Sequence, residues 1–275
     1  MRRIAHLSDL HFGRIGPRIV DVLVDDLESC APDLIIISGD LTQRARTRQF
    51  AAARAFLDRL SAPCMVVPGN HDVAPMFRPM SRAFRPFARY RRYVTQDMAP
   101  TFIDEEIAVA GVTTARSYRW SEGSVSLRQI EGVRQFMDGL DDRLLKIVFT
   151  HHPFLPPPDS PDTALVRHAR SSLPVFESVG VNLLLAGHLH RGFTGDVTHH
   201  HTAIKRSILV AQASTATSTR LRAEPNAYNF IRWDAPHLRL SSRIWDGDAF
   251  QQAEVETFAQ DGHRWHRAGR DAMPG

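Results

Sequence analysis

The chain of 275 residues is 43% hydrophobic and 23% charged, which is typical of a soluble globular protein and excludes a disordered or fibrous chain. Its length suits one large α/β core better than two small domains. The formal net charge is only +4, so the sequence fits an anionic substrate without requiring nucleic acid as a partner. No run approaches the roughly 18 apolar residues of a transmembrane helix, and the first ten residues lack a secretory hydrophobic region, which predicts a cytoplasmic protein.

Short apolar runs alternate with helical patterns in the first half of the chain. Three of these runs have the length of strands: residues 4–7, 34–37 and 64–67. Between them, residues 19–27 and 50–60 space their apolar side chains at helical intervals. This alternation predicts β-α-β units that build a largely parallel sheet.

The second half contains a further group of strands. Residues 147–149 and 181–186 are continuously apolar, as strands buried on both faces are. Ser126 followed by Gln129 resembles a capping box, and predicts a helix that ends near Gly139. Antiparallel strands are expected after this helix, over residues 208–210, 228–233 and 238–244.

We expect a single domain over residues 1–250, because hydrophobic periodicity fades after that point, and a mobile tail over residues 251–275. Within the domain, residues 76–95 contain arginines at helical spacing among aromatic and methionine side chains. This segment is either a solvated arginine face over buried aromatics or a basic cap that grips phosphate or rests on anionic lipid. Pro86 should divide it into two short helices.

Five short polar motifs each follow a predicted strand. They are Asp9-Leu10-His11, Gly39-Asp40, Gly69-Asn70-His71-Asp72, His151-His152 and Gly187-His188-Leu189-His190. Ligands of open α/β sheets bind beyond the carboxyl ends of the strands, so these motifs should converge at one site. Each motif alone is weak evidence, but chance is a poor explanation for all five in this order.

The residue types and spacing of these motifs favour metal binding. Asp9 and His11 are two residues apart, as are His188 and His190, and residues with this separation in an extended chain point to the same side. Carboxylate, imidazole and asparagine carbonyl groups suit manganese, iron or zinc, and one carboxylate can bridge two ions. Glycines beside three of the motifs let the backbone turn tightly next to the ions.

The ordered motifs resemble the signature of the calcineurin-like metallophosphoesterase superfamily over residues 9–190. The resemblance implies an αββα sandwich of two mixed β-sheets flanked by helices. It also implies two divalent or trivalent metal ions as cofactors, with manganese, iron and zinc as the alternatives. One ion would be held by Asp9, His11, Asp40 and His190, and the other by Asp40, Asn70, His151 and His188.

The resemblance further implies attack of a metal-bridging hydroxide on a phosphodiester, without a covalent enzyme intermediate. His71 matches a family histidine that is not a ligand, and we expect it to act in catalysis on the phosphoryl oxygens or the leaving group. Asn70 and His71 are expected to contact substrate, as is Arg116 after the apolar run of residues 107–112. Asp72 is expected either to orient His71 or to end the turn.

The overall layout resembles most the class III cyclic-nucleotide phosphodiesterase branch, so the expected substrate is a small phosphodiester or nucleotide. The alternative is a lipid A pathway hydrolase that cleaves UDP-diacylglucosamine and also has an arginine-rich cap. A DNA nuclease ranks third because the chain has little room for DNA-binding segments, and a non-enzymatic scaffold is disfavoured because every ligand position is filled.

Three further features stay open at the level of the sequence. These are a peripheral membrane contact, a homo-oligomer, and an additional metal site at His199, His200 and His201, which otherwise form an exposed polar strand edge.

Overall fold

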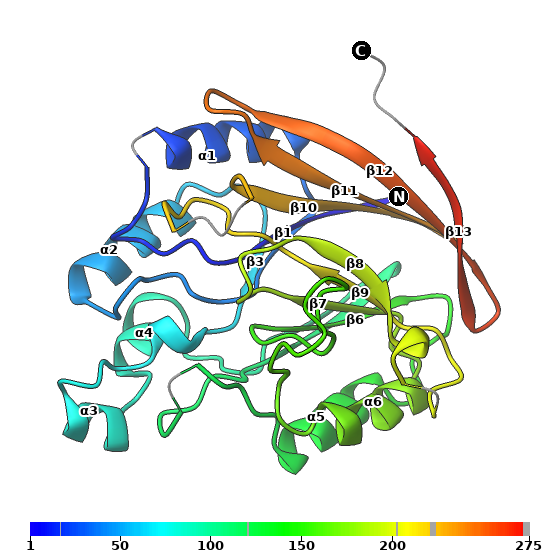
Figure 1. The fold of residues 1–275 in the computed structure, drawn as a ribbon, viewed down its shortest axis with the longest axis horizontal. Coiled ribbons are helices and arrows are strands. Elements are labelled where there is room, and N and C mark those ends of the chain that lie inside the picture. The colour runs from blue at the N-terminus through cyan, green and yellow to red at the C-terminus, as the bar shows by residue number, and fades with distance from the viewer. Residues whose placement is uncertain (17, 120, 202, 221–223, 272–275) are drawn as a thin grey trace.

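The computed structural model describes residues 1–16, 18–119, 121–201, 203–220 and 224–271. Within these ranges the chain forms two β-sheets packed face to face (Figure 1). In spatial order, the first sheet consists of β13 (Arg264–Asp271), β12 (Phe250–Asp261), β11 (His237–Trp245), β10 (Ala227–Asp234), β1 (Arg2–Leu7), β2 (Leu34–Ile37) and β3 (Cys64–Val66). The second consists of β4 (Thr101–Ile103), β5 (Ile107–Val112), β6 (Leu145–Thr150), β7 (Leu183–Ala186), β9 (Leu209–Gln212) and β8 (Phe193–Asp196).

Both sheets are mixed, with their parallel strands grouped together. β1, β2 and β3 run parallel to one another, whereas β10 to β13 pair antiparallel. In the second sheet β5, β6, β7 and β9 run parallel, and β4 and β8 are antiparallel edges. Every residue of β2, β5, β6 and β7 is buried, which explains why their sequences are apolar except for Lys146 and Thr150 of β6.

Apolar side chains fill the space between the sheets and the space under the helices. One apolar cluster lies between the sheets. It contains Ile36 and Val67, from β2 and the residue after β3, and Ile147 and Leu185 of the second sheet. The helices α1 (Ile19–Cys30) and α2 (Thr47–Leu57) cover the outer face of the first sheet, and α5 (Leu127–Met137) and α6 (Ala169–Ser178) cover that of the second (Figure 1). The predicted sandwich of two mixed sheets flanked by helices is confirmed.

Local signals also specify the helix ends. Ser126 Oγ accepts a hydrogen bond from the Gln129 amide at 3.3 Å, so the predicted capping box begins α5. The arginine-rich segment forms α3 (Pro79–Phe84) and α4 (Ala88–Tyr93), with Pro86 between them as expected.

The expectation of a mobile tail from residue 251 is wrong for residues 251–271, while residues 272–275 lie outside the described ranges. β12 and β13 form a hairpin that extends the first sheet. Phe258 and Trp265 belong to the inter-sheet core, and the Trp265 ring lies 6.0 Å from that of Trp233 between centroids. Only a few widely spaced residues of this hairpin are large and buried, so its sequence lacks the dense apolar pattern of the inner strands.

Trp265→Ala should lower the free energy of unfolding by about 3–5 kcal/mol, because it removes a large buried ring. It also removes the hydrogen bond from Nε1 to the Asn182 carbonyl at 3.2 Å. Chemical denaturation measures the change, and His266→Ala, at an exposed neighbouring position, is the control that should change little. Equal stability of the two variants would contradict this packing.

Candidate metal centre

Seven polar side chains lie just beyond the carboxyl ends of parallel strands in the two sheets. Asp9 and His11 follow β1, Asp40 follows β2, Asn70 follows β3, His151 follows β6, and His188 and His190 follow β7. Because the two sheets bring these strand ends to the same edge of the sandwich, the side chains meet there, as expected from the sequence.

The first group of side chains surrounds one oxygen of Asp9. His190 Nε2 lies 3.2 Å from Asp9 Oδ1, and His11 Nε2 lies 3.5 Å from the same oxygen. The two imidazole nitrogens are 3.0 Å apart. All three side chains are buried, so these polar atoms face one another out of contact with solvent.

The second group surrounds His151. Its Nε2 lies 3.4 Å from Asp40 Oδ2, 3.0 Å from Asn70 Oδ1 and 3.2 Å from His188 Nδ1. Asp40 Oδ2 also lies 3.8 Å from His11 Nε2, so this carboxylate stands between the two groups.

These separations fit ligands of metal ions. Two ligand atoms about 2.1 Å from one ion, at angles of about 90–110°, lie about 3.0–3.4 Å apart. Asp9 Oδ1 is buried and makes no hydrogen bond within the described ranges, so a free acceptor oxygen faces the two imidazoles. Carboxylates, imidazoles and one amide oxygen are the donors that manganese, iron and zinc accept.

In Asp9 and Asp40, one carboxylate oxygen accepts hydrogen bonds that fix the side chain, and the other oxygen faces the histidines. Asp9 Oδ2 accepts hydrogen bonds from Ser8 Oγ at 2.6 Å and from the His188 amide at 2.8 Å. Asp40 Oδ1 accepts one from the His71 amide at 2.8 Å. These bonds fix both carboxylates in orientation and leave Oδ1 of Asp9 and Oδ2 of Asp40 toward the histidines.

Backbone carbonyls fix two of the imidazole rings in the same way. His151 Nδ1 donates to the Ser38 carbonyl at 2.8 Å, and His190 Nδ1 donates to the Arg220 carbonyl at 3.0 Å. With Nδ1 held by a carbonyl, each ring turns Nε2 toward the centre, and this nitrogen offers a lone pair once it carries no proton.

The backbone at the centre is strained. Asp9, His11, Asp40, His188 and His190 all have positive φ, between 49° and 75°. This left-handed region costs a residue with a side chain roughly 1–3 kcal/mol, and such residues cluster at functional sites. The neighbouring glycines relieve crowding, because a Cβ on Gly69 would overlap the Asp40 carboxylate and one on Gly187 would overlap Ser8 Oγ.

Asp72 supports the loops and does not contact the ring of His71. Its carboxylate accepts hydrogen bonds from the amides of Leu41 (3.1 Å), Thr42 (2.8 Å) and Gly69 (3.0 Å), and from Thr42 Oγ1 (2.9 Å). It therefore joins the loop that carries Asp40 to the loop that carries Asn70. Of the two expected roles, the structure favours the end of the turn, because Asp72 is the last residue of the 3₁₀ helix η1 (Asn70–Asp72) and no hydrogen bond joins it to the His71 ring within the described ranges.

The charges of the cluster shift the pKa values of its members. Burial opposes ionisation of Asp9 and Asp40, but the neighbouring histidines hold the pKa of both carboxyls below the usual range. Burial also opposes protonation of His151, yet Asp40 raises its pKa to about 9. Burial and the neighbouring His151 lower the pKa of His188 to about 4. At neutral pH the carboxylates are ionised, and His151 carries a proton that a cation must displace.

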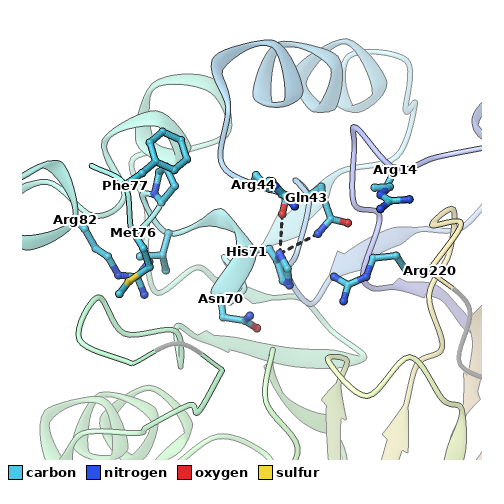
Figure 2. A pocket seen from close by; sticks show the side chains of 11 residues that line it. Arg14, Gln43, Arg44, Asn70, His71, Met76, Phe77, Arg82 and Arg220 are labelled. Atoms are coloured by element: carbon cyan, nitrogen blue, oxygen red, sulfur yellow. Dashed lines mark hydrogen bonds between the residues drawn. The ribbon is translucent and has the colours of Figure 1, made fainter. Parts of the chain in front are cut away.

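His71 lines a pocket next to the centre and is oriented through Nδ1. This atom donates to the Gln43 carbonyl at 2.7 Å, so Nε2 is the ring nitrogen left for a ligand (Figure 2). His152, by contrast, uses both ring nitrogens, with Thr114 Oγ1 at 2.7 Å and the Ser121 carbonyl at 3.0 Å. His152 is therefore a loop support, although its ring lies near the rings of the candidate ligands His151 and His188.

The pocket has a volume of about 560 Å³ and is lined by side chains from several loops. Its lining consists of Arg14, Gln43, Arg44, Asn70, His71, Val73, Pro75, Met76, Phe77, Arg82 and Arg220. Sequence reasoning missed Gln43, Arg44, Arg14 and Arg220. Gln43 and Arg44 follow the Asp40 motif closely and proximity could have indicated them, whereas Arg220 lies far from every motif.

Two arginines of the segment 76–95 have structural partners that the sequence did not reveal. The buried guanidinium of Arg82 donates to the carbonyls of Ala74, Ser117 and Arg119, each at 2.7 Å. Arg89 donates to the Ala45 carbonyl at 2.9 Å. The expectation of a phosphate-gripping cap is therefore wrong for Arg82, because all three of its guanidinium nitrogens donate to backbone carbonyls, and it stays a prediction for Arg89.

Arg116 lies four residues after the end of β5 and does not line the pocket. Its guanidinium donates to the carbonyls of Thr113 and Ala115 and to Gln129 Oε1. A contact with substrate stays a prediction for this residue.

His199, His200 and His201 lie at the 3₁₀ helix η2 (Val197–His199) and just after it. Among the described residues, no group of potential metal ligands includes them.

A family model agrees with this geometry. The model described as calcineurin-like phosphoesterase matches residues 2–192. A glycerophosphodiester phosphodiesterase of Enterobacter lignolyticus is 30% identical over 172 residues, which are 56% of this chain and 57% of that protein. A probable cyclic nucleotide phosphodiesterase of Fibrobacter succinogenes is 24% identical over 92% of this chain and 93% of its own. The chain thus spans little more than half of the first relative and most of the second.

The chain is also similar to a third protein over a short segment, and to a solved structure in its fold. A UDP-2,3-diacylglucosamine pyrophosphatase of Chlamydia muridarum is 33% identical over 75 residues, covering 26% of this chain and 23% of that protein. Purple acid phosphatase PPD1 from yellow lupin superposes with a TM-score of 0.71 at 12% identity, over 95% of this chain and 54% of its own. At this identity the structural likeness concerns the fold alone.

None of the described helices is long and apolar enough to cross a membrane.

Asp40→Ala should lose most of the bound metal, because this carboxylate faces both groups of ligands. Elemental analysis of dialysed protein should find about two ions per wild-type chain and fewer than one per variant chain. Asp248→Ala, which changes a carboxylate that is 82% exposed, is the control and should keep its ions. An unchanged metal content in the Asp40→Ala variant would contradict the site.

Metal binding to stripped protein should release protons at pH 7 and bind more tightly as the pH rises toward 9. The sign follows from His151, whose raised pKa of about 9 keeps it protonated in the metal-free protein. Calorimetric titrations in buffers of different ionisation enthalpy measure the protons released. The control is His237→Ala, which removes an exposed histidine away from the centre and should release the same number of protons as the wild type. Affinity that is constant between pH 7 and 9 would argue against a protonated ligand.

Proposed function

The chain belongs to the calcineurin-like phosphoesterase family, and from this premise we propose that it is a phosphodiesterase with two metal ions that share Asp40. Family and relatives make it a metal-dependent phosphoric ester hydrolase. The observation that carries the two-ion proposal is the place of Asp40 Oδ2, at 3.8 Å from His11 Nε2 and 3.4 Å from His151 Nε2. Small phosphodiesters are the proposed substrates, with cyclic nucleotides and glycerophosphodiesters to be tested first, because the relatives carry those names.

The carboxylates and His71 have different roles in the proposed reaction. When bound, the ions activate water and neutralise the charge that develops on the phosphoryl oxygens. Asp9 and Asp40 hold their positions through the Ser8, His188 and His71 bonds, so little reorganisation is needed during turnover. His71, anchored through Nδ1, presents Nε2 to the pocket, where a protonated ring can donate to a phosphoryl or leaving oxygen.

The first assay compares hydrolysis of bis(p-nitrophenyl) phosphate with that of p-nitrophenyl phosphate by stripped protein reloaded with manganese. The proposal predicts cleavage of the diester with a larger kcat/KM than the monoester, and loss of at least about 100-fold in the Asp40→Ala variant. Activity confined to the monoester would make the enzyme a phosphatase instead.

His71→Ala should retain both ions yet lose about 100- to 1000-fold in kcat, because the ring acts on the substrate and not on the metals. Metal content and kcat are measured on the same preparation. Gln43→Glu, which keeps the backbone carbonyl that holds Nδ1, should lose much less. Full activity of His71→Ala would remove the residue from the mechanism.

A second candidate function is hydrolysis of the pyrophosphate bond of a nucleotide-linked lipid such as UDP-diacylglucosamine. The observation that favours it is an apolar surface beside the pocket, formed by Met76, Phe77, Met80 and Phe84, which are 59–75% exposed. Met76 and Phe77 also line the pocket, so this surface continues into the site. Contiguous exposed apolar side chains of this kind mark contact with lipid or with a partner.

If the lipid function is right, the protein should sediment with vesicles of anionic phospholipid, and the double variant Phe77→Ser/Phe84→Ser should not. Leu127→Ser is the matched control, because Leu127 is 79% exposed at the start of α5 and outside the pocket lining. If wild-type protein stays in the supernatant, the lipid function is contradicted and only the small-phosphodiester function stands.

A further inference from the structure

The pocket beside the metal centre has two chemically different walls. In the view of Figure 2, Arg14 and Arg220 lie on one side of His71, Met76 and Phe77 lie on the other, and Arg44 lies between the two groups. No aspartate or glutamate lines this pocket within the described ranges. The first wall is therefore strongly cationic.

The backbone fixes the loops that carry these arginines. The Arg14 carbonyl accepts hydrogen bonds from the Thr219 amide at 2.7 Å and from Thr219 Oγ1 at 3.1 Å, and a β-bridge joins Ile15 to Ser218. The Arg220 carbonyl binds the ring of the proposed ligand His190. Two loops from opposite ends of the chain are thus held side by side at the metal centre.

The third arginine is tied to the loop that orients His71. The Arg44 amide donates to Gln49 Oε1 at 3.0 Å, and the preceding residue, Gln43, holds His71. All three guanidinium groups therefore come from loops whose positions are set by the site itself.

These guanidinium groups are available for a ligand. None of the three forms an ion pair with a carboxylate within the described ranges, whereas nearby surface arginines such as Arg18 and Arg191 do. All three arginines are exposed, so solvent screens their mutual repulsion, and together they give the pocket a positive potential that attracts an anion. The scissile phosphate does not account for them, because the metal centre and His71 already face its charge.

We propose that Arg14, Arg44 and Arg220 form a subsite for a second phosphate group, so that the preferred substrate carries one phosphate beyond the scissile one. The guanidinium group binds phosphate oxygens in pairs, and three such groups match the two charges of a phosphate better than the single charge of a carboxylate. Nucleoside diphosphates and pyrophosphate diesters belong to this class. The inference rests on the proposed function, since the subsite borders the same pocket.

Binding of adenosine 5′-monophosphate and adenosine 5′-diphosphate to manganese-loaded protein, measured by calorimetry, tests the subsite without requiring turnover. Wild-type protein should bind the diphosphate at least about tenfold more tightly than the monophosphate. The triple variant Arg14→Gln/Arg44→Gln/Arg220→Gln should lose most of this ratio. Arg48→Gln, an exposed arginine outside the pocket lining, should retain it.

Hydrolysis of bis(p-nitrophenyl) phosphate by the same preparations separates the two proposals. A ratio that is the same in wild-type protein and the triple variant would overturn the subsite, even where the diester is cleaved. A ratio that falls in the triple variant would support the subsite, and absence of diester cleavage would then count only against the proposed function. Because the ions are common to all variants, chelation of metal by the diphosphate cannot produce the difference.

Discussion

Two buried carboxylates, Asp9 and Asp40, are the constraint on which the structure of the site depends. Each emerges from the first sheet and faces groups that emerge from the second, through the His188 amide in one case and the His151 ring in the other. Buried negative charge is unfavourable unless it is paired. Burying these two carboxylates therefore requires the neighbouring histidines and the hydrogen bonds from backbone amides. The same requirement explains why five residues of the centre tolerate a left-handed backbone conformation.

This arrangement separates the reaction from the choice of substrate. The proposed ligands sit just beyond the ends of parallel strands, where the sheets fix them, and Asp72 joins the loops that carry Asp40 and Asn70. The side chains of Arg14, Arg44 and Arg220 point into the pocket from loops whose backbone is tied to the centre, so these side chains can change while the carbonyls of Gln43 and Arg220 still hold His71 and His190. A family with one reaction and many substrates is the expected result of such a design.

The sequence was informative where local pattern and chemistry coincide. A polar motif after an apolar run indicates a ligand at a strand end, so the place of Asp9, Asp40 and His151 could be predicted. The hairpin of β12 and β13 could not, because its contribution to the core depends on a few residues such as Trp265. Nor could the role of Arg82, because its partners are backbone carbonyls whose positions only the folded chain defines. Arg14 and Arg220, 206 residues apart, meet through loop pairing that leaves no periodic signal.

The most direct measurement is anomalous X-ray diffraction from crystals of the protein loaded with manganese. The account predicts two anomalous peaks about 3.5–4 Å apart, with Asp40 in contact with both. A single peak, or two peaks that do not share Asp40, would contradict the shared-carboxylate centre.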